Sequence, residues 1–237
     1  MTKVAILIDG GFFLKRLPAV RKDIDAQNPV DVDKAIGQLI WNHLDSILKQ
    51  YGGDKHYSLL YRCFYYDARP YLDKAHLPIS KKAIDYSKTE QAKFRLSLFD
   101  CLRKRPNLAV RLGQVELERS WILRDSAQSD LLADKRRVSD LNDNDFLPGL
   151  RQKAVDMRLG LDIASITLKR QADTIILVTG DSDFVPAAKL ARREGVRVIL
   201  DPLWRSVKSE LFEHIDGLRS GFARPGNQQQ QPDAAYE

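Results

Sequence analysis

The stretch Ile175–Phe184, IILVTGDSDF, decides the fold, because an apolar run ends there in a turn that carries two carboxylates. The run is typical of a buried strand, which we expect over Thr174–Val178. A helix is expected to follow directly, over Phe184–Arg193. Asp181 and Asp183 are therefore predicted to lie where a buried strand ends and a helix begins.

A second strand with the same ending opens the chain. Val4–Ile8 is a short apolar run that ends at Asp9, and Gly10-Gly11 then allows a tight turn. Neighbouring strands of a parallel sheet lie about 4.8 Å apart. If these two strands are neighbours, Asp9 comes within a few ångströms of the Asp181/Asp183 pair.

The rest of the chain alternates between helical and strand patterns, and its clearest strands are uniformly apolar. This alternation predicts a mostly parallel sheet with helices on both faces, which is a three-layer α/β/α sandwich. Ligands of such sheets bind outside the carboxyl ends of the strands. Asp67 and Asp201 also follow predicted strands, so we expect them at the same edge as Asp9. Further strands are expected over Tyr57–Tyr66, within Leu108–Leu123 and over Val196–Leu200, and further helices over Phe12–Leu17, Val32–Gln50, Lys88–Lys104, Leu150–Lys169 and Ser206–Glu213.

One domain is expected over residues 1–220, with insertions near 67–87 and 113–149. Residues 68–87 are interpreted as a loop or insertion over the strand ends, and residues 124–149 as a loop or small insertion. From Gly221 the chain is rich in Gln, Pro and Asn, and this composition predicts a disordered tail over 221–237. No apolar segment reaches the roughly 18 residues that a membrane span requires. Two cysteines without zinc-site spacing argue against a disulfide framework and favour a reducing compartment, so we predict a cytoplasmic protein without a membrane partner.

The net charge of +6 permits a polyanionic partner. Basic clusters occur at Arg103–Arg105, Lys135–Arg137 and Arg192-Arg193. Each cluster by itself is typical of a solvated helix face. Together with an acidic pocket they fit an enzyme that acts on phosphodiesters, because carboxylates hold a metal ion while Lys and Arg hold the phosphate backbone.

The predicted helix Leu150–Lys169 adds further candidates. Asp156 is near the start of this helix, from where it could reach over the carboxyl edge of the sheet. Lys153 shares its helix face and would either bind a substrate phosphate or pair with Asp156. Asp162 falls on the row of the helix that is expected to face the core. It would be either a buried acid that supports the metal site or a purely structural acid.

Three close carboxylates stay ionised only if a cation or a donor compensates their charge. Oxygen ligands without nearby His or Cys favour Mg²⁺ or Mn²⁺ over zinc. The alternative is structural, since Ser182 or Asp183 could merely cap the following helix. Ser182 could also orient a water molecule at the site. The presence of Asp9 at a second strand end favours the shared metal site.

Three segments together resemble the NYN domain family, a PIN-like group related to LabA-type proteins. They are IDGGF at Ile8–Phe12, KAVDMRLGLD at Lys153–Asp162 and TGDSDF at Thr179–Phe184, and the resemblance extends over roughly Thr2–Leu203. Ala154 departs from the glycine that the family usually has there. The resemblance implies a PIN-like sandwich with ribonuclease activity. It also implies that Asp9, Asp156, Asp181 and Asp183 are metal-binding and catalytic.

The function expected from these observations is metal-dependent cleavage of RNA with Mg²⁺ or Mn²⁺. The alternative is an RNA-binding or regulatory protein that retains the metal site without catalysis. A phosphatase-like reaction at Asp9 is disfavoured because Gly11 replaces the second Asp that this chemistry uses. A dinucleotide site is disfavoured because the first turn lacks GxGxxG. The sequence leaves open which RNA is cut, whether cutting is internal or terminal, and whether the chain is a monomer or a homodimer.

Overall fold

The computed structural model describes residues 3–51 and 56–226. At its centre is a seven-stranded sheet with the order β6-β5-β2-β1-β7-β8-β9. All neighbouring strands are parallel except β5 and β6, which are antiparallel. The predicted mostly parallel sheet is therefore confirmed. Its strands are β1 (Val4–Asp9), β2 (Leu60–Arg69), β5 (Leu108–Leu123), β6 (Phe146–Lys153), β7 (Thr174–Val178), β8 (Arg197–Asp201) and β9 (Gly217–Leu218).

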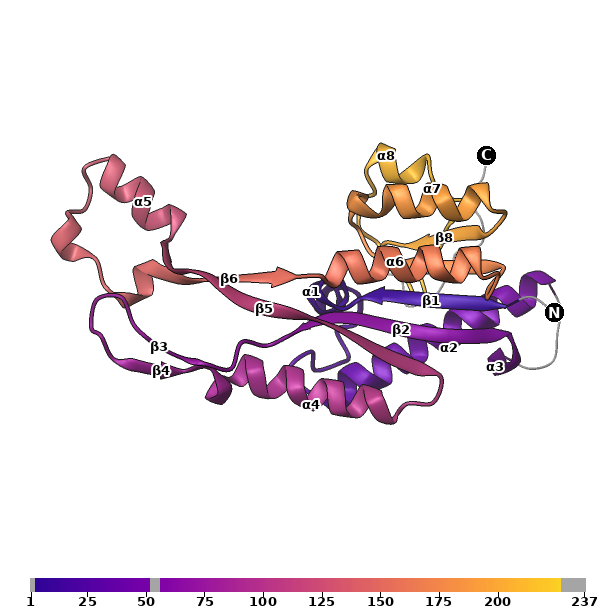
Figure 1. Cartoon of the computed structure of the whole chain (residues 1–237), viewed down its shortest axis with the longest axis horizontal. Helices are drawn as coiled ribbons and strands as arrows, with labels where there is room; N and C mark the ends of the chain where they lie inside the picture. Colours follow the sequence, from indigo (N-terminus) through magenta and orange to yellow (C-terminus); the bar gives the residue numbers. More distant parts are fainter. Residues whose placement is uncertain (1–2, 52–55, 227–237) are drawn as a thin grey trace.

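Helices cover both faces of the sheet, so the three-layer α/β/α architecture is also confirmed (Figure 1). One face carries α1 (Gly10–Val20), α2 (Pro29–Tyr51) and α4 (Glu90–Lys104), and the other carries α6 (Val155–Leu168), α7 (Val185–Arg193) and α8 (Ser209–Phe212). The side chains of β1 explain this arrangement. Ile6 and Ile8 pack on the first face and Ala5 and Leu7 on the second, and all four are fully buried.

The strand order reverses next to β1. The chain passes from β1 to β2 on one side, and β7 and β8 lie on the other side. Ile8 of β1 is in register with Val178 of β7, so the residues that follow these two strands meet at one edge. Open α/β sheets bind ligands at such a switch point, and the acidic residues predicted from the sequence lie at this one.

An arm extends away from the sheet (Figure 1). It is built from the outer parts of β5 and β6, the small sheet of β3 (Lys74–His76) and β4 (Ala83–Asp85), and the helix α5 (Asp125–Leu132). Residues 68–87 and 124–149 were interpreted as a loop or an insertion, and the structure shows that they are not plain loops. In the first segment β3 and β4 pair with each other, and in the second α5 and the start of β6 form, although the local composition indicates no regular structure.

Two predicted helix boundaries were also wrong. Residues 150–153, which were predicted as the start of a helix, belong to β6, because residues 146–153 pair with β5 from Leu123 opposite Phe146 to Gln114 opposite Lys153. The helix α6 begins only at Val155, after Ala154 in a left-handed conformation with φ of 63°. At the other end of the chain, α1 continues through Pro18 to Val20.

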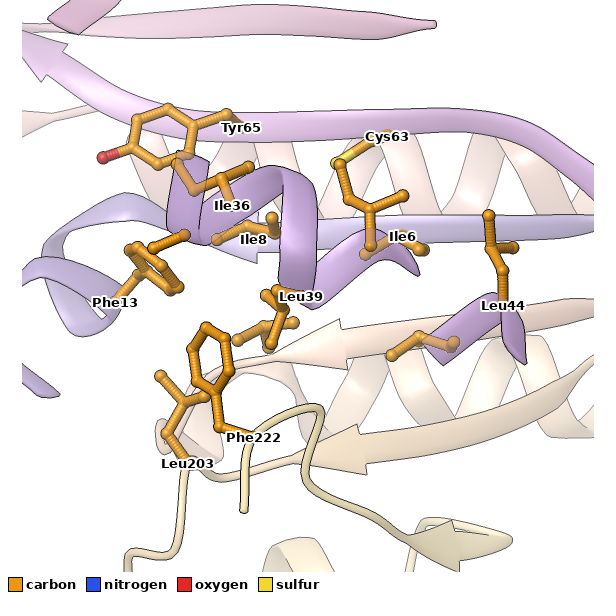
Figure 2. Close-up of a cluster of buried hydrophobic side chains, with 14 of the residues drawn as sticks. Ile6, Ile8, Phe13, Ile36, Leu39, Leu44, Cys63, Tyr65, Leu203 and Phe222 are labelled. Carbon is orange, nitrogen blue, oxygen red and sulfur yellow. The ribbon is translucent and has the colours of Figure 1, made fainter. Parts of the chain in front are cut away.

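The predicted tail begins inside the folded part. Phe222 is buried, and its ring lies beside Phe13 and Leu203 in the cluster that Figure 2 shows. The start of the predicted disordered segment is corrected accordingly, and residues 227–237 lie outside the described residues. Within the described part of the chain, no helix is long and apolar enough to cross a membrane.

Candidate functional site

Asp9 joins the first strand to the first helix. It ends β1 and caps α1, where its Oδ1 accepts a hydrogen bond from the Phe12 amide over 3.0 Å. Its Oδ2 accepts a second hydrogen bond from the Thr179 hydroxyl over 3.1 Å. Burial raises the pKa of Asp9 above its ordinary value, and the charges of Asp156 and Asp67 add to this, while the two hydrogen bonds oppose it. The carboxylate is thus held in place in a poorly solvated position.

The turn after β7 is organised by Thr179 and Asp181. Thr179 is fully buried, and its Oγ1 accepts a hydrogen bond from the Asp181 amide over 3.2 Å. Asp181 caps the short helix Ser182–Phe184 by accepting a hydrogen bond from the Asp183 amide over 3.1 Å. The side chains of Asp181 and Asp183 are both exposed. They are therefore open to solvent and to a ligand, unlike the half-buried Asp9.

Asp156 joins this group from the first turn of α6. Partial burial raises its pKa, and the next causes are the negative charges of Asp181 and Asp183. Asp156 also contributes to the raised pKa of Asp9. The four predicted acids therefore lie within electrostatic reach of one another, at the edge where β1 and β7 end.

Two glycines allow the strand ends to approach each other closely. A Cβ at Gly10 would lie 2.6 Å from the carbonyl oxygen of Tyr66, and one at Gly180 would lie 2.7 Å from the ring of Phe12. Both distances are shorter than a Cβ contact allows. At Gly10 the obstacle includes backbone, so glycine is required there for the close packing of β1, α1 and β2, whereas at Gly180 the Phe12 side chain would have to shift.

Two of the predicted substrate contacts have other roles here. Lys153 lies at the end of β6, and its Nζ forms an ion pair of 2.7 Å with Glu116. The predicted helix face shared with Asp156 does not exist, because Lys153 precedes the helix. Ser182 is half-buried, and the cap of its turn is supplied by Asp181 instead.

The remaining acids have fixed partners of their own, although the charge of Asp67 still reaches Asp9. Asp162 accepts hydrogen bonds from the Tyr66 hydroxyl over 2.9 Å and from Arg111 over 3.2 Å, so it fastens α6 to the sheet. Asp67 is buried inside β2 in an ion pair with Arg95. Sequence reasoning identified the position of Asp67 but missed its partner, since nothing in residues 88–104 distinguishes Arg95 from other surface cations.

Asp201 is a structural anchor. Its carboxylate is fully buried, lies 2.9 Å from Nε2 of His43 and accepts hydrogen bonds from the amides of Leu203 and Gly221, each over 2.8 Å. With its carboxylate already holding these three groups, it is not available to a ligand. Asp201 lies at the same edge as Asp9, as expected, because it ends β8 opposite Val178 of β7, but it is buried there and does not join the acidic group.

The donor chemistry at the edge fits a hard divalent cation. All four acids offer carboxylate oxygens. Burial is the largest cause of the raised pKa values of Asp9 and Asp156, and a cation would relieve the smaller repulsion between neighbouring acids that adds to it. Among residues 3–51 and 56–226, however, no three His, Cys, Asp or Glu side chains are arranged to hold a metal ion. Asp156, Asp181 and Asp183 are exposed, so their side chains are able to turn toward a cation.

Comparison with known proteins matches part of the chain to a family. Residues 124–213 match the model of the NYN domain. NYN domains form a PIN-like nuclease family. The NYN match includes Asp156, Asp181 and Asp183, whereas Asp9 lies outside it, so the resemblance predicted from the sequence is confirmed for this stretch.

The other comparisons add less. A crystal structure of a protein of unknown function from Vibrio parahaemolyticus has 16% sequence identity and a TM-score of 0.44, over 93% of this chain and 95% of that chain. A search of curated proteins gave no significant match.

Proposed function

We propose that the protein is a metal-dependent ribonuclease that hydrolyses RNA phosphodiester bonds at the edge where β1 and β7 end. The observation that carries this proposal is the gathering of Asp9, Asp156, Asp181 and Asp183 at the switch point of the sheet. The match of residues 124–213 to the NYN domain supports the proposal, because NYN domains form a nuclease family. RNA is the substrate class that this family suggests.

Asp9, Asp156, Asp181 and Asp183 would hold the cation, for which Mg²⁺ and Mn²⁺ are the candidates. A divalent ion bound there supplies a more acidic water and neutralises the charge that builds on the phosphate oxygens. The chain itself positions the acids. Thr179 and the Phe12 amide fix the carboxylate of Asp9, and the Asp183 amide fixes that of Asp181. The predicted cytoplasmic location stays a prediction.

A second candidate is an RNA-binding or regulatory protein without turnover. It is favoured by one observation, namely that no three acids in the described residues are arranged as a finished metal site. In this case the carboxylate group would bind a cation weakly and would serve to hold RNA. Metal binding and RNA cleavage must therefore be measured side by side.

The test uses the purified chain with a mixed RNA pool and Mn²⁺. We expect cleavage by the wild type, and its loss in Asp9→Asn and in Asp181→Asn, with folding retained as judged by circular dichroism. Asp100→Asn is the control, because Asp100 is an exposed acid on α4 that pairs only with Arg103. Wild-type rates in the double variant Asp9→Asn/Asp181→Asn would show that the site is assigned wrongly.

Isothermal titration with Mn²⁺ separates the two candidates. Binding together with cleavage supports the ribonuclease, and binding without cleavage supports the non-catalytic protein. Mapping the ends of the cleaved RNA then distinguishes internal from terminal cutting.

A further inference from the structure

A basic cleft of about 650 Å³ lies at the opposite edge of the sheet from the acidic group. It is formed by the last turn of α7, the turn that leads into β8 and the segment after α8. The helix α7 begins at Val185, directly after the turn that carries Asp181 and Asp183, and its last turn lines the cleft. Its nine residues span about 14 Å at 1.5 Å per residue. The cleft is lined by Lys189, Arg192, Arg193, Gly195, Val196, Arg197, His214 and Asp216.

The lining carries four cationic side chains against a single carboxylate. Arg192 is held in place by Asp216 over 2.8 Å and by the carbonyl oxygen of Glu213 over 3.0 Å. Asp216 is in turn fixed by the amide of Val198 over 2.8 Å. The one acid that lines the cleft is thus already paired with Arg192 and hydrogen-bonded to the Val198 amide, and Arg197 donates a hydrogen bond to Gln50 over 3.4 Å.

Lys189 and Arg193 are exposed at this cleft. Within the part of the chain that the structure describes, neither forms an ion pair with an acid. The last turn of α4 is also basic, but its Arg103 forms an ion pair with Asp100 over 2.8 Å. Cationic side chains that line one cleft repel one another. Binding of an anion relieves this repulsion, so such a cleft attracts anions.

The lining also indicates the kind of anion. Among the described residues that line the cleft there is no Phe, Tyr or Trp, and His214 supplies the one aromatic ring, beside four cationic side chains. Bases are held by stacking on aromatic rings or guanidinium planes and by contacts with base edges, whereas phosphate groups need only cations and donors. The lining therefore favours phosphates over bases.

We infer that this cleft binds backbone phosphates of an RNA strand whose other part lies at the acidic edge. The inference rests on the proposed function for its ligand, since RNA is the substrate proposed there. Lys189 and Arg193 supply the contacts with phosphate oxygens, and Arg192 and Arg197 form the positively charged floor. Such contacts hold an RNA strand without reading its sequence.

The experiment measures RNA binding with EDTA present, so that no cleavage takes place. A fluorescently labelled oligouridylate of about 20 nucleotides is titrated with the full chain, and binding is followed by anisotropy at several salt concentrations. The test variant is Lys189→Gln/Arg193→Gln. The matched control is Arg103→Gln/Lys104→Gln, which removes the same charge from exposed residues in the last turn of α4.

We expect the cleft variant to weaken RNA binding at least tenfold at 0.1 M salt, and the control less than threefold. Two lost phosphate contacts with a single strand should also reduce the slope of log K against log salt by about 1.4. Equal losses in both variants would mean that only net charge matters, and would overturn the inference. So would unchanged RNA binding in the cleft variant, provided that its urea midpoint matches that of the wild type.

Labelled ATP and inorganic phosphate serve as the second arm of the experiment. If the wild type binds either of them tightly, and the cleft variant loses this binding but keeps its affinity for RNA, the cleft is a site for small phosphates and the inference is wrong. Loss of RNA binding in the cleft variant supports the inference even if the wild type never cleaves RNA with Mn²⁺. Absence of cleavage by the wild type would contradict the proposed ribonuclease activity but not the inference about the cleft.

Discussion

The hydroxyl of Thr179 donates a hydrogen bond to Oδ2 of Asp9 over 3.1 Å, and so connects the ends of β7 and β1. Oγ1 of Thr179 also accepts a hydrogen bond from the Asp181 amide over 3.2 Å. One buried side chain therefore fixes two acids that are separated by most of the chain. This makes Thr179 a positioning residue for the acidic group, although it carries no charge.

Replacement of Thr179 by Val keeps the shape of the side chain but removes its hydroxyl. Asp9 then loses a donor and the Asp181 amide loses its acceptor, which should lower the free energy of unfolding by about 1–3 kcal/mol. Cleavage with Mn²⁺ should fall as well, because both acids lose their orientation. Urea unfolding and RNA cleavage are measured on Thr179→Val and on Thr179→Ser, which keeps the hydroxyl. Equal behaviour of the two variants would contradict this role.

Asp156→Asn should stabilise the protein at neutral pH. Partial burial, followed by the charges of Asp181 and Asp183, raises the pKa of Asp156 above 3.8. The folded protein thus holds this proton more tightly than the unfolded chain does. Ionisation of Asp156 therefore lowers the free energy of unfolding as the pH rises through the raised pKa, and the loss persists at pH 7.

The expected gain for Asp156→Asn at pH 7 is less than about 1 kcal/mol, because the side chain is exposed and solvent screens its interactions. The gain should shrink as the pH falls and disappear below about pH 3, where the acid is protonated in both states. Chemical denaturation of wild type and variant across this range, without metal, measures the difference. Asp100→Asn removes an acid that pairs with a cation, so it should show no such gain. A loss of stability in Asp156→Asn at pH 7 would refute the proposed repulsion.

The parts of the fold that the sequence predicted correctly are those in which local pattern and tertiary structure agree. Thr174–Val178 forms β7 with the predicted bounds, because a uniformly apolar run can only be accommodated between two helix layers. Asp9, Asp181 and Asp183 were placed at strand ends for the same reason. These acids lie close together because β1 and β7 are neighbours in the sheet. The sequence predicted their closeness only if the two strands were neighbours.

The errors occur where distant partners decide the structure. Residues 146–153 carry no clear strand pattern, and they form β6 only because the long strand β5 lies beside them. The ion pair of Lys153 with Glu116 is a consequence of this strand pairing. A prediction that places Lys153 in a helix therefore misses this partner. Likewise, the burial of Asp201 depends on His43 and on the amide of Gly221, which are far away in the sequence.

Gly10→Ala and Gly11→Ala should have opposite effects, although the two residues are adjacent. A Cβ at Gly10 would lie 2.6 Å from the Tyr66 carbonyl oxygen, and β2 cannot move away without breaking its pairing with β1. We expect Gly10→Ala to lower the free energy of unfolding by about 2–3 kcal/mol. The nearest atom to a Cβ at Gly11 is Oδ1 of Asp9 at 3.5 Å, an ordinary contact.

Gly11→Ala should therefore stabilise α1 by up to about 1 kcal/mol, which is the helix propensity difference between the two residues. Thermal unfolding of both variants beside the wild type provides the measurement. A stable Gly10→Ala variant would mean that β1, β2 and α1 do not meet as closely as described. Destabilisation by Gly11→Ala would show that the surroundings of Asp9 have no room for a methyl group.

Phe222→Ala should unfold the protein at a much lower denaturant concentration, even though Phe222 lies in a segment that composition assigned to a tail. Its side chain is 4% exposed, its ring centroid lies 6.4 Å from that of Phe13, and the guanidinium of Arg21 lies 5.2 Å from the ring. Removal of a buried aromatic ring costs about 3–5 kcal/mol. Phe222→Leu keeps most of the volume and should cost less than about 1.5 kcal/mol. Urea unfolding of the three proteins ranks them, and equal midpoints would show that the segment around Phe222 is not part of the core.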